Sequence, residues 1–110
     1  MRGVVAATGW VVFFALLGIS RASARDVLVS SRFSNTIVRY NDTTGALVGI
    51  FAAGPELQNP NGIAYGPDGN LYVGLGDAGS ILRYNGQTGA FMGTFVAAGS
   101  GGLAAVRDIA

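Results

Sequence analysis

The stretch NLYVGLGDAGSILRYNGQTGAFMGTFVA (70–97) repeats DVLVSSRFSNTIVRYNDTTGALVGIFAA (26–53) without a gap, at a spacing of 44 positions. The two copies share the patterns I-x-R-Y-N and T-G-A and a following glycine and phenylalanine. The pattern then continues, because LQNPNGIA (57–64) matches LAAVRDIA (103–110) after a two-residue insertion. Repeats of roughly 40 to 50 residues are typical of arrays and propellers, so this repeat is the strongest indication of the fold. We expect a first unit over about 26–53, a second over about 60–97 and the start of a third over about 103–110.

Each unit contains the local patterns of short β-strands. In the second unit we expect strands at GIAYG (62–66), LYV (71–73), SILRY (80–84) and AFMGTFV (90–96), with a PDG turn (67–69) after the first. Four short strands joined by tight turns and repeated at this length match a β-propeller blade. A β-sandwich would not predict such close self-similarity. The sequence therefore predicts an all-β fold, a partial β-propeller of about two four-stranded antiparallel blades.

The composition excludes much of ordinary catalysis. The 110 residues include 18 glycines but no cysteine and no histidine, and all seven basic residues are arginine. Without histidine or cysteine the chain has no Ser/His/Asp triad, no cysteine nucleophile and no zinc site of the usual kind. The chemistry left to it is that of carboxylates, amides, hydroxyls and carbonyls.

The first 24 residues have the features of a secretory signal peptide. Arg2 precedes an apolar run, VVAATGWVVFFALLGI (4–19), and Ala22-Ser23-Ala24 is a small-x-small cleavage site. An uncleaved membrane anchor is the alternative, but it would need about 20 apolar residues. We expect a signal-peptide helix, a secreted or periplasmic location, and no membrane contact after cleavage. The chain left after cleavage would contain five arginines and six acidic residues. Because it has no excess of positive charge, nucleic acid is not expected as a partner.

The stretch PNGIAYGPDGNLYV (60–73), followed by SILRYNGQTGAFMGTF (80–95), resembles the NHL-repeat family and its streptogramin-lyase-like and gluconolactonase-like relatives. A degenerate earlier copy lies in 26–51, so the resemblance covers nearly all of 25–110. It implies incomplete NHL-like propeller repeats after the signal peptide. The motifs specify the fold better than the function, because such propellers serve as enzymes, binding platforms and extracellular proteins.

The number of repeats is small for a closed propeller. Four blades of this length need about 176 residues, and two open blades would leave sheet faces and edges exposed. We therefore expect the sequence to be part of a longer protein whose remaining blades close the ring. Self-association of the chain into a ring is the alternative.

The motif GLGDAG (74–79) has the G-x-G-x-x-G spacing of a dinucleotide-binding loop. Such a loop requires a helix after it, whose N–H groups hold the phosphates. The residues that follow, SILRY (80–84), instead predict a strand. We expect these glycines to shape a turn between two strands.

The gluconolactonase-like resemblance implies a metal ligand at Asn61, which would face the central channel. An amide oxygen suits a divalent ion such as calcium, although a site needs several oxygen ligands. The next unit has Arg107 at this position, which would repel a cation, and the carboxylate ligands would have to come from other blades. The alternative is that Asn61 is a turn residue before a strand and does not bind a metal.

Other residues of the repeat are interpreted from their positions in it. Asp77 and its counterpart Phe33 fall in the loop between the second and third strands, a surface that propeller relatives use for ligands. Asp68 is expected to stabilise its turn. Arg39 and Arg83 recur at one position, which favours packing between blades over a unique site.

No converging acid, base or nucleophile is evident and no cofactor is identified. We therefore expect a secreted binding or structural module, with an unknown protein, small molecule or carbohydrate as ligand. The alternative is part of a metal-dependent lactonase or a streptogramin-lyase-like enzyme, whose reacting groups would lie in other blades.

Overall fold

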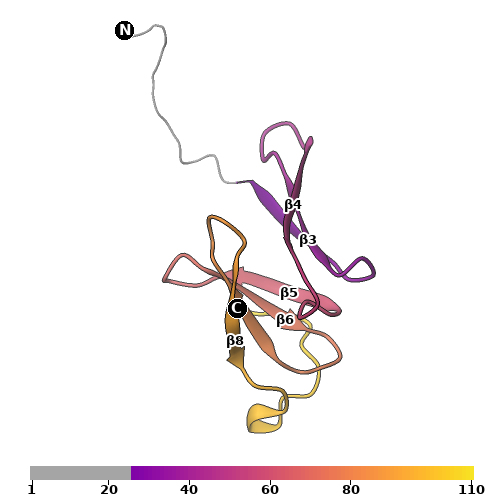
Figure 1. Ribbon diagram of the computed structural model, residues 1–110, viewed down its shortest axis with the longest axis vertical. Coiled ribbons are helices and arrows are strands. Elements are labelled where there is room, and N and C mark those ends of the chain that lie inside the picture. The colour runs from indigo at the N-terminus through magenta and orange to yellow at the C-terminus, as the bar shows by residue number, and fades with distance from the viewer. Residues whose placement is uncertain (1–25) are drawn as a thin grey trace, which may run out of the picture. The chain divides into compact units, whose positions relative to one another are not determined.

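The computed structural model describes residues 26–110, and the expected signal peptide and its helix lie outside this range. The described chain is all-β and contains two antiparallel sheets (Figure 1). The first sheet has three strands, in the order β2 (Val27–Ser31), β3 (Thr36–Tyr40), β4 (Leu47–Ala53). The second has four, in the order β5 (Pro60–Tyr65), β6 (Leu71–Leu75), β7 (Ile81–Tyr84), β8 (Phe91–Val96). A short 3-10 turn, η1 (Ser100–Gly102), follows β8.

The strands expected in the second unit are all present. They pair in sequence order, with Val73 of β6 opposite Ile63 of β5 and also opposite Leu82 of β7. The β7–β8 pair contains two register shifts, and β8 lies at the edge of its sheet. An irregular edge strand is a poor template for further pairing, which protects that edge.

The two sheets show the repeat at the level of their turns. The Asn85 side chain accepts the backbone N–H groups of residues 87 and 88, each at 2.9 Å. In the first sheet Asn41 accepts those of residues 43 and 44, at 2.9 and 2.8 Å. Each turn closes on a glycine of positive φ, 75° at Gly45 and 77° at Gly89. The shared T-G pattern thus encodes the same asparagine-initiated turn twice.

The first sheet corresponds to only part of the second. A shift of 44 residues places β2, β3 and β4 over β6, β7 and β8. The counterpart of β5 would fall at 16–21, outside the described residues. Four strands are therefore present in the second sheet, whereas the described part of the first sheet has three.

One face of the second sheet forms the core. The register places four buried side chains on this face, which we call face A: Leu71, Val73, Leu82 and Tyr84. They belong to one cluster with residues of the first sheet and the connecting segment, namely Ile37, Phe51, Ala52 and Leu57. Burying each large side chain contributes roughly 1.5–3 kcal/mol, so this cluster is the main stabilising feature of the described chain.

Segment 57–64, which includes most of β5, also makes polar contacts with the first sheet. The Ser30 hydroxyl donates to the Asn61 carbonyl at 2.6 Å, and the Asn59 N–H donates to the Asn35 side chain at 2.9 Å. The segment 103–110 contacts the second sheet at the corresponding positions. Val106 lies against Gly74, the counterpart of Ser30, and the Ala104 carbonyl lies against Gly79, the counterpart of Asn35.

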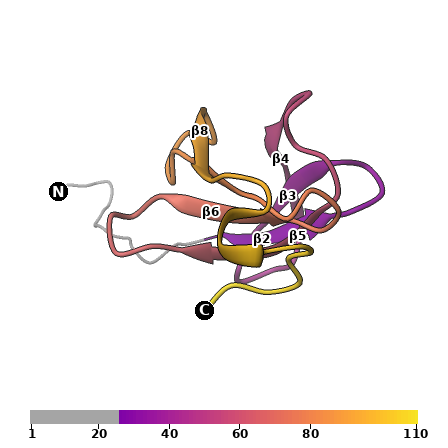
Figure 2. The same ribbon diagram turned by 90° about the horizontal axis from the view of Figure 1, so that it is seen from below.

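The start of a third unit, expected at 103–110, contains no strand. This segment nevertheless runs back past β5, where the backbone of Asp108 approaches Gly62 (Figure 2). Val106, within the same segment, is buried. Segment 103–110 therefore contacts the second sheet where 57–64 contacts the first, but it has no partner strand within residues 26–110.

Candidate ligand-binding loops

Two equivalent loops supply the candidate site. Residues 32–35 join β2 to β3, and residues 76–80 join β6 to β7. Both loops follow the strands that correspond across the repeat, and each contains one of the residues predicted to face a ligand, Phe33 and Asp77.

Arg32 connects the two predicted residues. Its guanidinium lies 3.8 Å from the Asp77 carboxylate and 5.9 Å from the centre of the Phe33 ring. The Arg32 and Asp77 side chains are 51% and 71% exposed, and Phe33 is 95% exposed. An exposed ion pair contributes only about 0.2–1 kcal/mol, so this arrangement adds little to stability. Its groups remain accessible to a ligand.

One side-chain amide contacts the Asp77 carboxylate, and a second is linked to it through hydrogen bonds. The Asn59 side chain donates to Asp77, and the Asn59 carbonyl accepts the Gly76 N–H at 2.8 Å. The Asn35 side chain accepts the Asn59 N–H and also donates to Gln58, at 3.3 Å. Asn35 and Asn59 both have positive φ, 57° and 51°, a conformation that asparagine tolerates better than most residues. Through these hydrogen bonds Asn59 connects the two loops, since it contacts Asn35 of one and Gly76 of the other.

Gly76 and Gly79 of GLGDAG lie in this loop, as predicted, whereas Gly74 lies in β6. β7 follows them directly, so no helix N-terminus is available for a phosphate. Gly79 has φ of 66°, and a Cβ built there would lie 2.1 Å from the Ala104 carbonyl oxygen. A Cβ at Gly74 would lie 2.1 Å from a methyl group of Val106. These two glycines therefore admit segment 103–110 against the second sheet.

Asn61 is engaged in contacts between chain segments. Its side-chain amide donates to the Val106 carbonyl at 3.1 Å, and its own carbonyl accepts the Ser30 hydroxyl. Within residues 26–110 no three acidic residues lie close enough to hold a metal ion. A metal at Asn61 would therefore need oxygen ligands beyond those of the described carboxylates.

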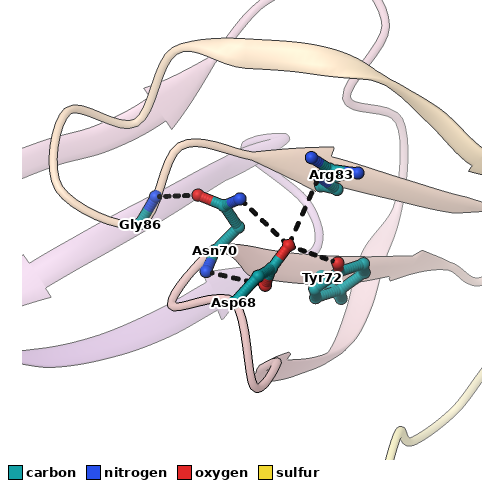
Figure 3. A network of polar contacts seen from close by, with 5 residues as sticks. All are labelled: Asp68, Asn70, Tyr72, Arg83 and Gly86. Carbon is teal, nitrogen blue, oxygen red and sulfur yellow. Dashed lines mark hydrogen bonds and ion pairs between the residues drawn. The ribbon is translucent and has the colours of Figure 1, made fainter.

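A second polar cluster lies at the turn between β5 and β6 (Figure 3). The Asp68 carboxylate accepts the backbone N–H of Asn70 at 3.1 Å and the Tyr72 hydroxyl at 2.9 Å, and lies 3.8 Å from Arg83. The Asn70 N–H, followed by the Tyr72 hydroxyl, lowers the pKa of Asp68. The same carboxylate raises the pKa of Tyr72. The carboxylate holds the turn together, as expected for an aspartate at this position.

The recurring arginines contact their own sheets. Arg83 approaches Asp68 of the turn beside it, and Arg39 lies 5.7 Å from the centre of the Phe51 ring on the adjacent strand. The Arg83 Nε atom is buried without a hydrogen-bond partner. At this recurring position the arginine therefore contacts the neighbouring turn or strand of its own sheet.

The sequence interpretation missed Arg32 and the amide side chains of Asn35, Gln58 and Asn59. The 44-residue shift places Arg32 opposite Gly76, so comparison of the two loops gave no recurring residue to single out. The positive φ of Asn35, opposite Gly79, was a usable signal. Asparagine aligned with glycine across a repeat indicates a left-handed position, and hence a fixed loop.

Comparison with protein-family models, with curated proteins and with solved structures found no match. Among residues 26–110 the structure contains no helix of the length and hydrophobicity needed to cross a bilayer.

Proposed function

We propose that this chain forms blades of a secreted, NHL-like β-propeller that binds a carbohydrate at the loops containing Arg32, Phe33 and Asp77. The observation that carries the proposal is the fully exposed Phe33 ring beside an accessible guanidinium and carboxylate. An exposed aromatic ring beside charged groups offers a ligand both an apolar surface and hydrogen-bonding groups.

The propeller part of the proposal is supported by the repeated stacking relation. The same positions of β2 and β6 contact the segment that follows each sheet, first 57–64 and then 103–110. A relation that repeats from one unit to the next is the principle of a radial array of sheets. Closure of the ring would require further blades.

The carbohydrate is favoured by the combination of groups at the site. A sugar presents an apolar C–H face and a rim of hydroxyls that both donate and accept hydrogen bonds. The Phe33 ring offers an apolar platform, Asp77 offers acceptors, and Arg32 offers several donors. A few polar groups around an aromatic surface are the usual composition of a small-molecule site.

The alternative, part of a metal-dependent lactonase or streptogramin-lyase-like enzyme, depends on groups beyond these loops. Asn61 would supply one metal ligand, and a general base or further carboxylates would come from other blades. The binding module requires only residues that already lie together, so it is the function we propose.

The test is binding of the purified full-length chain to an array of neutral and acidic oligosaccharides, followed by titration calorimetry on the best ligand. Phe33→Ala removes the platform and should weaken binding roughly 10- to 100-fold, the equivalent of about 1.5–3 kcal/mol for a buried aromatic contact. Asp77→Asn should also weaken it, because the neutral amide is a poorer acceptor and leaves Arg32 without its partner.

Leu47→Ala provides the matched control. Leu47 is an exposed apolar residue at the start of β4, beyond the β3–β4 turn and away from these loops along the strand. Its replacement should leave the affinity unchanged. If no oligosaccharide binds to folded protein, or if Phe33→Ala binds as well as the wild type, the proposed function is wrong.

A further inference from the structure

The two sheets leave complementary faces open. The face of the second sheet opposite face A, which we call face B, contains Tyr72, Gly74, Ile81 and Arg83 by the β6–β7 register. Phe95 contacts Tyr72 edge to face at 4.8 Å and so belongs to face B. The same faces of the first sheet are defined through the 44-residue shift, with Val29 on face A and Ile37 on face B.

Within the chain, face B of the first sheet packs on face A of the second. Ile37 and Phe51 from the first sheet share one buried cluster with Val73 and Leu82. The other two faces, face A of the first sheet and face B of the second, contain counterparts of these buried residues that are exposed to solvent. Val29, the counterpart of Val73, is 44% exposed against 0%, and Phe95, the counterpart of Phe51, is 57% exposed against 8%.

The edge of the first sheet and the end of the chain are also complementary. Among residues 26–110 β2 has a partner strand on one side only, whereas its counterpart β6 lies between β5 and β7. Segment 103–110 is the counterpart of 57–64, which includes most of β5, and it already lies on face B of the second sheet. It therefore has the sequence of a missing first strand, and β2 has the edge that such a strand would join.

From these features we propose that a second copy of this chain joins the first head to tail. Segment 103–110 of one copy pairs antiparallel with β2 of the next, and face B of the second sheet covers face A of the next first sheet. The occupant is a second copy because each open surface would then meet the counterpart of the surface that its own counterpart meets within the chain. The two surfaces differ, so the contact is heterologous and generates a ring if the rotation closes.

The proposal fixes a register. In the second sheet Ile63 of β5 lies opposite Val73, and Ala64 lies opposite Tyr72. Applied to these pairs, the shifts between repeat units place Ile109 of one copy opposite Val29 of the next. In the same way they place Ala110 opposite Leu28. Propellers have typically 4 to 8 blades, so a ring of two-sheet chains would contain roughly two to four copies.

The register is tested by cysteine cross-linking of the full-length chain, which has no native cysteine. Directly opposite Cα atoms in an antiparallel pair lie about 4.5–5.5 Å apart, within the range that a disulfide spans. V29C protein is mixed with I109C protein under mild oxidation. The expected product is a disulfide-linked heterodimer, at least tenfold more abundant than homodimers of either variant alone.

A matched pair controls for random collision. L47C replaces an exposed apolar residue on β4, the other edge of the first sheet, and should not link to I109C. Light scattering of the wild-type chain after size exclusion should give the mass of several copies. F95E, which places a charge on face B, should reduce that mass to a monomer while circular dichroism still shows folded β-structure.

The inference shares the repeat geometry of the proposed function but does not depend on a ligand. F33A should lose carbohydrate binding and still assemble, so failure of one proposal is distinguishable from failure of the other. A wild-type chain that is monomeric at high concentration would overturn the inference. An assembly without the 29–109 cross-link, or with V29C homodimers in equal yield, would overturn it as well.

Discussion

Replacement of Gly79 by alanine should destabilise the protein far more than the same change at Gly76, three residues earlier in GLGDAG. At Gly79 the backbone φ is 66°, in the left-handed region, whereas Gly76 has no positive φ. A Cβ at Gly79 would also lie 2.1 Å from the Ala104 carbonyl oxygen, against 3.4 Å from the nearest atom at Gly76. The two positions therefore separate strain and collision from the general effect of replacing glycine.

The magnitude follows from two contributions. A left-handed conformation costs a residue with a side chain roughly 1–2 kcal/mol. The collision is with backbone, so segment 103–106 must move, and the buried Val106 would lose part of the roughly 1.5–3 kcal/mol that burial of its side chain contributes. We expect Gly79→Ala to lower the free energy of unfolding by about 2–4 kcal/mol. At Gly76, reduced freedom of the unfolded chain offsets the close contact, so a change of less than about 1 kcal/mol is expected.

The assay is urea unfolding followed by far-ultraviolet circular dichroism, at one fixed protein concentration because assembly would add to the apparent stability. Gly79→Asn divides the two contributions, because asparagine tolerates positive φ and occupies the corresponding position as Asn35. It should recover part of the loss but not all, since its Cβ meets the same carbonyl. Equal stability of the Gly76 and Gly79 alanine variants would refute the reasoning.

Three further predictions concern Tyr84, Asp68 and Asn61. Burial, followed by the 2.8 Å hydrogen bond to Glu56, raises the pKa of Tyr84, so the folded state should lose stability as pH rises above about 10, the ordinary tyrosine pKa. Tyr84→Phe should lack this tyrosine's alkaline loss and, at neutral pH, be less stable by about 1–2 kcal/mol in urea unfolding. The lowered pKa of Asp68 adds stability above its ordinary value of 3.8 that is lost on acidification, so Asp68→Asn should flatten the acid limb of a melting-temperature profile. Calcium at millimolar concentration should not raise the melting temperature, and a clear rise that Asn61→Ala abolishes would instead favour a metal site.

The sequence predicted the strands of the second sheet because the repeat and the turn residues give independent indications of the same boundaries. Asn85 and Gly89 mark one turn, and Asp68 and Gly69 mark another, each through a local hydrogen bond or a positive φ. Such features depend on neighbours in sequence, so they are visible without a structure. For this reason the sequence predicted the second sheet. It also predicted that no helix follows GLGDAG.

The site was less predictable because its residues are joined by contacts between distant segments. Phe33 and Asp77 were predicted from their shared loop position, but Arg32 reaches Asp77 only when the two loops lie side by side. Segment 103–110 was expected to begin a third unit. It has no partner strand in the described chain, and strand formation requires a partner whatever the sequence of the segment.

The glycines of GLGDAG connect these observations. In the first sheet the positions of Gly74 and Gly79 are occupied by Ser30 and Asn35, whose side chains hold segment 57–64 through hydrogen bonds. In the second sheet those side chains are absent, and segment 103–110 approaches the backbone directly. The repeat thus preserves the place where the next segment lies while it exchanges polar contacts for close packing. A motif that suggests a phosphate loop is here the surface against which segment 103–110 packs. Substitutions that disturb this packing should therefore lower stability more than they weaken ligand binding.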